Sequence, residues 1–213
     1  FGTRNDGFAS FSSYVQIVTT VFMLLFSINF SSYYLALRGK LKDAFNTEVR
    51  VFIGLVAVVI TIITLDIVNM YGSVGEALKH SAFNVASIIS TTGFASDNFD
   101  LWPNLSRTLL VLIMFVGACA GSTGGGIKVS RILILIKGMA KELKSIVHPK
   151  QVKKITIDSR EGEHEVVRSV NAYIVCYVAI FLVSVLILSF EETDLVTNFT
   201  AVTATINNIG PGL

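Results

Sequence analysis

The sequence predicts an all-α polytopic membrane protein, made of repeated helix–pore loop–helix units around one pore. Three observations predict this class: charge is scarce, charge is clustered, and one pattern of helices and loops recurs. Of the 213 residues, 52% are hydrophobic and 15% are charged, whereas soluble domains carry about 25% charged residues. The uncharged runs between the clusters reach the roughly 20 apolar residues that a membrane-spanning helix needs.

The positive charges predict which side of the membrane each loop faces. Fourteen of the 17 Lys and Arg residues lie in two blocks, 38–50 and 128–168. Cytoplasmic loops of membrane proteins are enriched in these residues, so both blocks are expected to face the cytoplasm. The remaining segments carry an excess of Asp and Glu, which would concentrate cations at an outer pore mouth. Membrane lipid is therefore the expected surrounding, and no nucleic-acid partner is expected.

The first half of the chain is predicted to hold two spans and one helix too short to cross. A helix from about Phe8 to Leu37 runs inward, and a second from Val49 to about Met70 returns outward. Ser81 to Ser90 is helix-like but too short for a span. It ends at STTGF, and ASDNFDLWPN leads back to the outer side. The simplest interpretation is a re-entrant helix and an extended loop, which a membrane tolerates only inside protein or beside water.

The second half of the chain predicts the same order of elements. Leu105 to Met139 forms a span that contains a glycine-rich stretch near its middle. Lys153 to Val167 alternates like a cytoplasmic β-hairpin with a turn near Gly162, a plausible docking surface for a regulatory partner. Val166 to Phe190 crosses outward, and Leu195 to Ile206 is a second short apolar helix that ends at NNIGPGL.

Internal repetition supports this division. A shift of 117 positions lays Gly93 on Gly210 and Ile89 on Ile206, and a shift of 93 lays Phe1-Gly2-Thr3 on Phe94-Ala95-Ser96. Periodic self-similarity of this kind indicates a repeat assembly. We expect the chain to be a piece of a longer protein, which begins after one re-entrant loop and stops after the third. Its units are then 1–48, 49–150 and 151–213.

The ends of the two short helices carry residues suited to holding a cation. Each helix points its C-terminal end, with about half a negative charge, toward the membrane midplane. Extended backbone after a glycine could aim carbonyl oxygens at a central axis and replace the hydration shell of a monovalent cation. A tight turn alone would explain one such glycine, but two in equivalent places favour an ion site. The predicted ion-binding residues are Thr91, Thr92, Gly93, Phe94, Asn208, Ile209 and Gly210.

The stretch GACAGSTGGGIKVSR has a different predicted role. A phosphate-binding loop needs Lys directly after its last Gly, whereas Ile127 stands there, and no strand precedes the stretch. A broken helix beside a water-filled path fits better, with Ser122 and Thr123 satisfying freed backbone groups. The predicted gating loop comprises Gly117, Gly121, Ser122, Thr123, Gly124, Gly125, Gly126 and Lys128. Arg131 is expected to reach toward the cytoplasm, and Lys128 either does the same or forms a cationic barrier.

In combination, STTGF, GSTGGGIKVSR, VHP and NNIGPGL resemble the Trk-type potassium uptake subunits of bacteria, within the superfamily of Ktr and plant high-affinity potassium transporters. The resemblance covers essentially the whole chain. It implies four potassium-channel-like repeats around one pore, of which this chain would supply the end of the second, the third, and most of the fourth. Thr91–Gly93 and Asn208–Gly210 would be filter segments three and four, and Phe1 and Gly2 a remnant of filter two. It further implies a homodimer in the inner membrane, on a cytoplasmic ring of nucleotide-binding regulatory subunits.

These observations lead to one main functional hypothesis and one alternative. The main hypothesis is potassium uptake through a carbonyl-lined filter, gated by the glycine-rich loop, with K⁺ as cargo and no cofactor in this chain. The alternative is a secondary transporter that couples potassium to sodium or protons. That class predicts inverted repeats, whereas the repeats here run in the same direction. An enzyme is not expected, because the sequence offers no constellation of nucleophile and base.

Overall fold

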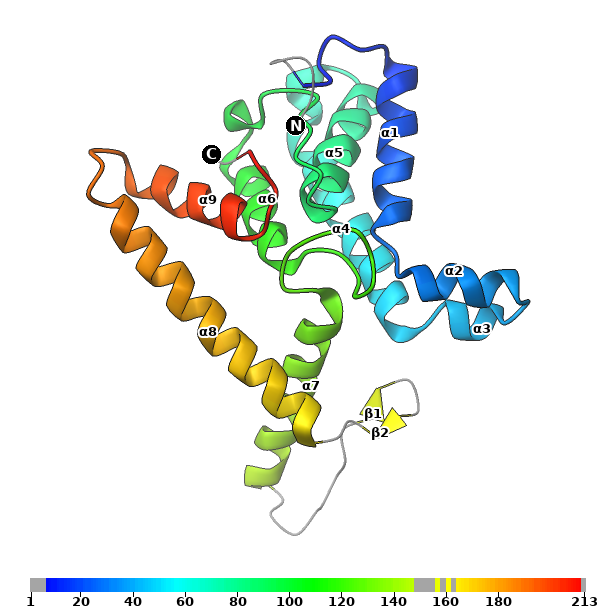
Figure 1. Cartoon of the computed structure of the whole chain (residues 1–213). Helices are drawn as coiled ribbons and strands as arrows, with labels where there is room; N and C mark the ends of the chain where they lie inside the picture. The colour runs from blue at the N-terminus through cyan, green and yellow to red at the C-terminus, as the bar shows by residue number, and fades with distance from the viewer. Residues whose placement is uncertain (1–6, 148–155, 158–159, 162–163, 212–213) are drawn as a thin grey trace.

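The computed structural model describes residues 7–147, 156–157, 160–161 and 164–211, and these are mostly helical (Figure 1). Helix α5 (Val74–Ile89) lies in the middle of the upper part and packs against α1, α4 and α6. Helices α7 and α8 extend below this group and pack against each other. The predicted remnant of filter two at Phe1 and Gly2 lies outside the described residues, as does Gly162.

Among the described residues, two helices are long and apolar enough to cross a membrane: α4 (Thr47–Tyr71) and residues 165–188 of α8 (His164–Leu188). Asn46 caps the start of α4 by accepting from the backbone N–H of Val49 at 2.9 Å. Gly72, in the left-handed conformation, ends it. Two of the predicted spans are therefore present as helices of sufficient length, each beginning about a half-turn earlier than expected.

The predicted single helix from Phe8 to Leu37 is wrong. The segment forms α1 (Ser13–Phe26) and α2 (Phe30–Leu37), which are bent by 89° at the break between them. The segment is uncharged throughout, so its charge pattern does not mark the bend. Asn29 caps the new helix by accepting from Ser31 N at 2.8 Å. The short helix α3 (Leu41–Ala44) packs against α2, and the two project sideways together (Figure 1).

The predicted broken span is present as two helices. Helix α6 (Asn104–Val116) follows a short 3-10 helix, η1 (Phe99–Leu101), and α7 (Val129–Val147) begins after the glycine-rich loop. At about 1.5 Å per residue, α6 spans roughly 20 Å, which is short of the roughly 30 Å hydrocarbon core. The chain therefore breaks where the pattern of glycines predicts.

The β-hairpin is smaller than predicted. Strands β1 (Thr156–Ile157) and β2 (Arg160–Glu161) pair antiparallel, with Ile157 opposite Arg160. The predicted turn residue, Gly162, lies outside the described residues. The expected strand residues from His164 onward belong to α8 instead, where Glu165 lies in the first turn and favours the helix start. Helix α9 (Leu195–Ile206) has the predicted bounds.

The helix boundaries repeat with the period that the glycines indicated. Adding 117 to a residue number carries the start of α4 at Thr47 to the start of α8 at His164, and Tyr71 to Leu188. The same shift carries Ile89, the end of α5, to Ile206, the end of α9. The order of a long helix and a short helix is thus repeated in register.

The core of the molecule surrounds the lower half of α5. Ile88 and Ile89 are almost fully buried, together with Ile63 of α4 and Leu110 of α6. The helix also buries polar side chains, and Ser81 shares a hydrogen bond of 2.8 Å with Thr64. In a membrane, close packing and such interhelical hydrogen bonds hold helices together, because lipid is as apolar as the core. The C-terminal end of α5 is consequently held in place from several sides.

Candidate functional site

The C-terminal ends of α5 and α9 have the same backbone geometry. Thr91 and Asn208, which the 117-residue shift superposes, are both left-handed, with φ of 58° and 57°. Three backbone hydrogen bonds of 2.8–3.3 Å recur at equivalent positions in the two ends. After α5 they run from Ser90 N to Ala86 O, from Thr91 N to Ile88 O and from Thr92 N to Ser87 O. After α9 they run from Asn207 N to Thr203 O, from Asn208 N to Thr205 O and from Ile209 N to Ala204 O. The chain therefore makes the same turn twice.

The two turns meet each other. A Cβ atom added at Gly93, where φ is 78°, would stand 1.9 Å from the carbonyl oxygen of Ile209. No side chain fits in that space, so glycine is required by contact as well as by conformation. Gly210 also has a positive φ, of 113°, but a Cβ there would meet nothing within 4 Å. The structure thus brings Gly93 of the first turn directly against Ile209 of the second.

Phe94 lies differently from the other predicted ion-binding residues. Its backbone carbonyl accepts a hydrogen bond of 2.5 Å from the hydroxyl of Ser87. Its ring packs against Phe8, with 4.6 Å between the centroids. The carbonyl and the ring both help to fix the chain after the turn.

The glycine-rich loop, residues 117–128, interlocks with the break between α1 and α2. Cys119 N donates to Ser27 O at 3.0 Å, and Phe30 N donates to Gly121 O at 3.1 Å. Thr123 donates to Phe26 O twice, from its backbone N–H at 3.3 Å and from its hydroxyl at 3.2 Å. Two broken helices thereby satisfy each other's backbone groups, which hydrocarbon cannot do. The predicted role of Thr123 in satisfying freed groups is confirmed by these contacts.

The loop also touches both turns. Gly125 N donates to the hydroxyl of Thr91 at 2.6 Å. A Cβ atom at Gly125 would stand 2.5 Å from Asn207 O, and one at Gly124 would stand 3.0 Å from Ser90 O. The glycines therefore let the loop pass directly against the ends of α5 and α9.

The two ends of the loop are tied together. Lys128 N donates to Val116 O at 3.1 Å, and Val129 N donates to Ala118 O at 3.2 Å. The side chain of Lys128 turns back into the loop, where its Nζ donates to the carbonyl of Gly124. Ser122 closes a further turn by donating its hydroxyl to Cys119 O at 2.5 Å, as predicted for a group that satisfies freed backbone.

Arg131 was predicted to reach toward the cytoplasm, but its side chain turns back toward the loop and α8 instead. Its guanidinium lies 4.2 Å above the ring of Tyr173 on α8, and its Nη1 donates to Ile127 O at 3.2 Å. A guanidinium is attracted to the electron-rich face of an aromatic ring. Arg131 therefore joins the start of α7 to α8 instead of extending away from the break.

Sequence reasoning missed Glu48, the second residue of α4. Its side chain is only 9% exposed, and its Oε1 accepts from Ala120 N at 2.7 Å and from Ser130 N at 3.1 Å. An acidic residue in the first turn of a helix is common, so the sequence alone gives no reason to connect Glu48 with the loop.

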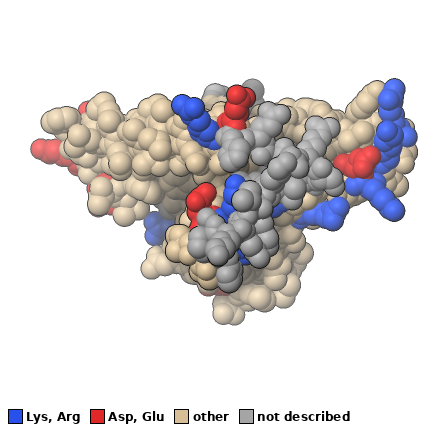
Figure 2. Space-filling model, turned by 90° about the horizontal axis from the view of Figure 1, so that it is seen from below, with Lys and Arg blue, Asp and Glu red and all other residues tan. Residues whose placement is uncertain are grey.

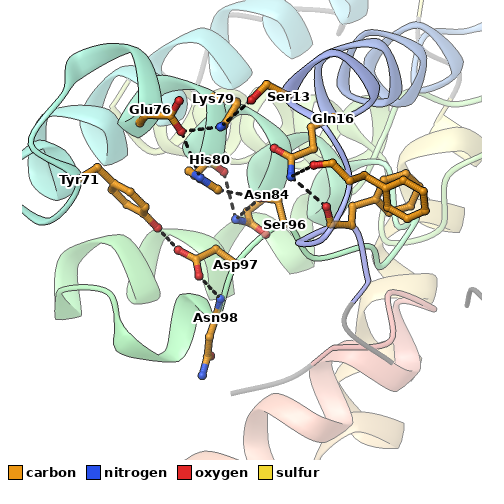
Figure 3. A network of polar contacts seen from close by, with 12 residues as sticks. Ser13, Gln16, Tyr71, Glu76, Lys79, His80, Asn84, Ser96, Asp97 and Asn98 are labelled. Carbon is orange, nitrogen blue, oxygen red and sulfur yellow. Dashed lines mark hydrogen bonds and ion pairs between the residues drawn. The ribbon is translucent and has the colours of Figure 1, made fainter. Parts of the chain in front are cut away.

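A network of polar side chains anchors the segment that follows the first turn (Figure 3). The hydroxyl of Tyr71 donates to Asp97 and accepts from Trp102 Nε1 at 3.1 Å. His80 Nδ1 lies 3.2 Å from the hydroxyl of Ser96. Through these contacts α4 and α5 hold residues 96–102 against the end of the molecule that is predicted to face outward.

Charged side chains gather at the ends of the molecule. Figure 2 shows Lys and Arg side chains on the lower face, gathered at the end where α2 and α3 project. This is the basic block 38–50, which contains Arg38, Lys40, Lys42 and Arg50.

Comparison with known proteins gives consistent matches. A family model described as "TrkH: Cation transport protein" matches residues 1–213. The Trk system potassium uptake protein TrkH of Salmonella typhimurium is 35% identical over the whole chain, and that of Escherichia coli K12 is 34% identical. The crystal structure of the potassium transporter TrkH from Vibrio parahaemolyticus superposes with a TM-score of 0.92 at 34% identity and covers the whole chain.

The chain spans less than half the length of these proteins. It covers 45% of the Salmonella and Escherichia coli relatives and 47% of the Vibrio structure. The matches therefore extend over all of this chain, while more than half of each relative has no counterpart in it.

Proposed function

Because the chain belongs to the TrkH family of cation transport proteins, we propose that it supplies two filter segments and the gate of a potassium-uptake pore. Residues 1–48 end the second repeat, 49–150 form the third with its broken inner helix, and 151–213 contain the cytoplasmic hairpin and the fourth up to its filter. Thr91–Gly93 and Asn208–Gly210 are filter segments three and four.

One observation carries this proposal: the same left-handed turn follows α5 and α9, and the two turns touch at Gly93 and Ile209. Each turn stands at the C-terminal end of a helix, where the backbone dipoles leave about half a negative charge. Two such ends directed at one place favour a positive ion there. The stretches Thr-Thr-Gly and Asn-Ile-Gly contribute no carboxylate, so the attraction suits a monovalent cation better than a divalent one.

The backbone carbonyls of these turns are the proposed ligands. A potassium ion enters a filter when carbonyl oxygens replace its shell of water. The backbone N–H groups of Thr91 and Thr92 donate back to α5, which fixes the direction of the peptide planes that follow. Ser87 donates to the carbonyl of Phe94, which fixes the orientation of that carbonyl and leaves its second lone pair for an ion.

The glycine-rich loop is the proposed gate. It contacts Thr91 and Asn207 at the inner ends of the two filter segments, which is where an ion leaving the filter would pass. Lys128 is held within the loop by Gly124 and adds a positive charge close to that path. A positive charge raises the electrostatic barrier to a cation. The loop must therefore move, or be moved, for potassium to pass.

The assembly of the complete protein is also a proposal. We expect a homodimer in the inner membrane with lipid around α4 and α8, on a cytoplasmic ring of nucleotide-binding regulatory subunits. The basic segments that include α7 and the hairpin are the proposed surface for that ring. The relatives are potassium uptake proteins of a Trk system, in agreement with a pore that works with other components.

Potassium flux from proteoliposomes that hold the complete protein tests the function. With only a potassium gradient imposed, we expect flux whose reversal potential follows potassium and is indifferent to sodium and proton gradients. Flux that appears only when a second ion gradient is imposed would replace the gated pore with the coupled transporter. Equal permeability to sodium and potassium would contradict the filter.

A further inference from the structure

Glu48 connects three parts of the molecule through one oxygen atom. It stands at the start of α4, and its Oε1 accepts from Ala120 N in the glycine-rich loop and from Ser130 N in the first turn of α7. Ala120 and Ser130 lie on opposite sides of the helix break. The carboxylate therefore spans the break and holds its two sides together from a third helix.

The two hydrogen bonds replace partners that the break removes. Ser130 is the second residue of α7, and the first N–H groups of any helix have no partner within it. Ala120 lies in irregular backbone, where its N–H has no helical partner. A carboxylate is the strongest neutral-pH acceptor for such groups, and the positive end of the α7 dipole adds to the attraction. At 9% exposure, Glu48 has little water to compete for these bonds.

The start of α4 does not need Glu48 as a cap. Asn46 already accepts from Val49 N at 2.9 Å. The shift of 117 residues places Glu165 at the equivalent position of α8, where the acid is exposed. An acid in this first turn is thus compatible with an exposed side chain.

We propose that Glu48 is the latch of the gate: it holds the glycine-rich loop against the filter ends and links the position of α7 to that of the loop. This inference rests on the proposed function. Because Ala120 and Ser130 share one acceptor, a displacement of α7 strains both bonds at once. Movement at the cytoplasmic end of α7 is thereby passed to the loop without any contact between a regulator and the filter.

Single-channel recording of the complete protein in lipid bilayers tests the latch. Glu48→Leu replaces the carboxylate with an apolar side chain of similar size that cannot accept a hydrogen bond, so the closed state loses both bonds. We expect the open probability to rise roughly tenfold, while the reversal potential between potassium and sodium stays at the wild-type value because the filter is untouched. Asp43→Asn, which neutralises an exposed acid on the neighbouring α3, is the matched control and should leave both quantities unchanged.

A second variant covers failure of the first to fold. Glu48→Gln keeps an oxygen at the same place but loses the charge, and neutral hydrogen bonds are about half as strong. We expect a rise in open probability of roughly threefold, between wild type and Glu48→Leu. An unchanged open probability in a folded variant, a loss of flux, or a reversal potential that shifts along with gating would each overturn the latch.

Hydrogen exchange separates this inference from the proposed function, because it needs no ion flux. If Glu48 acts as the latch, its hydrogen bonds protect the amides of Ala120 and Ser130 from exchange, and Glu48→Leu speeds the exchange of both amides at least severalfold. The amides of Thr91 and Thr92, which donate to α5, keep their protection. If the wild-type protein conducts no potassium but this pattern holds, the latch stands and the function falls. Equal exchange at Ala120 and Ser130 in both proteins would overturn the latch, whatever the flux.

Discussion

The proposed third and fourth repeats share a backbone but not their side chains. Their long helices begin and end 117 residues apart, and the turns after their short helices have φ of 58° and 57° at the same position. The side chains at that turn are nevertheless Thr-Thr-Gly in one and Asn-Ile-Gly in the other. What the two repeats have in common is therefore the direction of peptide groups, which agrees with a proposed filter built from carbonyl oxygens.

The difference between the repeats lies in how each turn is supported. Asn208 suits a left-handed conformation, but Thr91 is β-branched and rarely adopts it. Thr91 is held there by the N–H of Gly125, which donates to its hydroxyl at 2.6 Å. In the fourth repeat, Tyr177 of α8 donates to Asn207 Oδ1 at 3.1 Å instead. The third turn thus depends on the glycine-rich loop, and the fourth depends on its own long helix.

The largest expected effect comes from comparing the two filter glycines. Gly93→Ala places a Cβ 1.9 Å from Ile209 O, whereas Gly210→Ala meets nothing within 4 Å and keeps only its unfavourable φ. We expect Gly93→Ala to destabilise by roughly 3 kcal/mol or more through overpacking, and to abolish selection of potassium over sodium. Gly210→Ala should cost roughly 1–2 kcal/mol and retain part of the selectivity. Potassium-to-sodium permeability ratios and thermal unfolding of both variants measure these effects. Equal losses of selectivity and stability in the two variants would contradict the expected difference between the two glycines.

The next effect concerns the loop beneath the turns. In Gly125→Ala, the new Cβ would stand 2.5 Å from Asn207 O, so the loop has to move away from the filter ends. We expect the open probability to rise severalfold and stability to fall by roughly 1–3 kcal/mol. Gly54→Ala in α4, where a Cβ meets nothing within 4 Å, is the control and should stabilise slightly. Wild-type gating in Gly125→Ala would argue against the loop as an obstruction.

A smaller effect distinguishes the two supports of the turns. Thr91→Val keeps the shape of the side chain but removes the acceptor for Gly125 N, which leaves a half-buried N–H unpaired at a cost of roughly 1–3 kcal/mol. We expect a less stable closed state and faster hydrogen exchange at Gly125. Thr91→Asn copies the fourth repeat and relieves the left-handed strain, so it should preserve selectivity better than Thr91→Val. Selectivity lost equally in both would show that the hydroxyl itself matters to the ion.

The smallest effect is expected at the outer network. Tyr71→Phe removes the hydroxyl that joins Asp97 (Figure 3) to Trp102. The variant should lose roughly 1 kcal/mol of stability with no change in open probability. Thermal unfolding together with single-channel recording checks both parts. A gating change as large as that of Gly125→Ala would mean that the outer segment is coupled to the gate.

The sequence predicted the features that depend on local pattern. Uncharged runs located α4 and α8, and the pair Gly93 and Gly210 located the two turns and their period. The glycine density between α6 and α7 placed the break, because glycine weakens any helix whatever surrounds it. These are properties of neighbouring residues, which a single sequence displays directly.

The features that were missed depend on contacts between distant residues. The apolar run around Ser27 reads as one helix, and its 89° bend is stabilised by bonds to Cys119 and Thr123, about a hundred positions away. Asn29, a favoured N-cap residue, was the one local signal of that bend. Glu48 and Arg131 were likewise placed by partners on other helices. Charge alone could not show where either side chain points.

Locating the ion tests the central claim most directly. Crystals of the complete protein soaked in thallium or rubidium, which replace potassium and scatter anomalously, would show where cations bind. The account predicts a peak within coordination distance of backbone carbonyls from both Thr91–Gly93 and Asn208–Gly210. A peak held by side-chain carboxylates elsewhere, with none between these two turns, would contradict it.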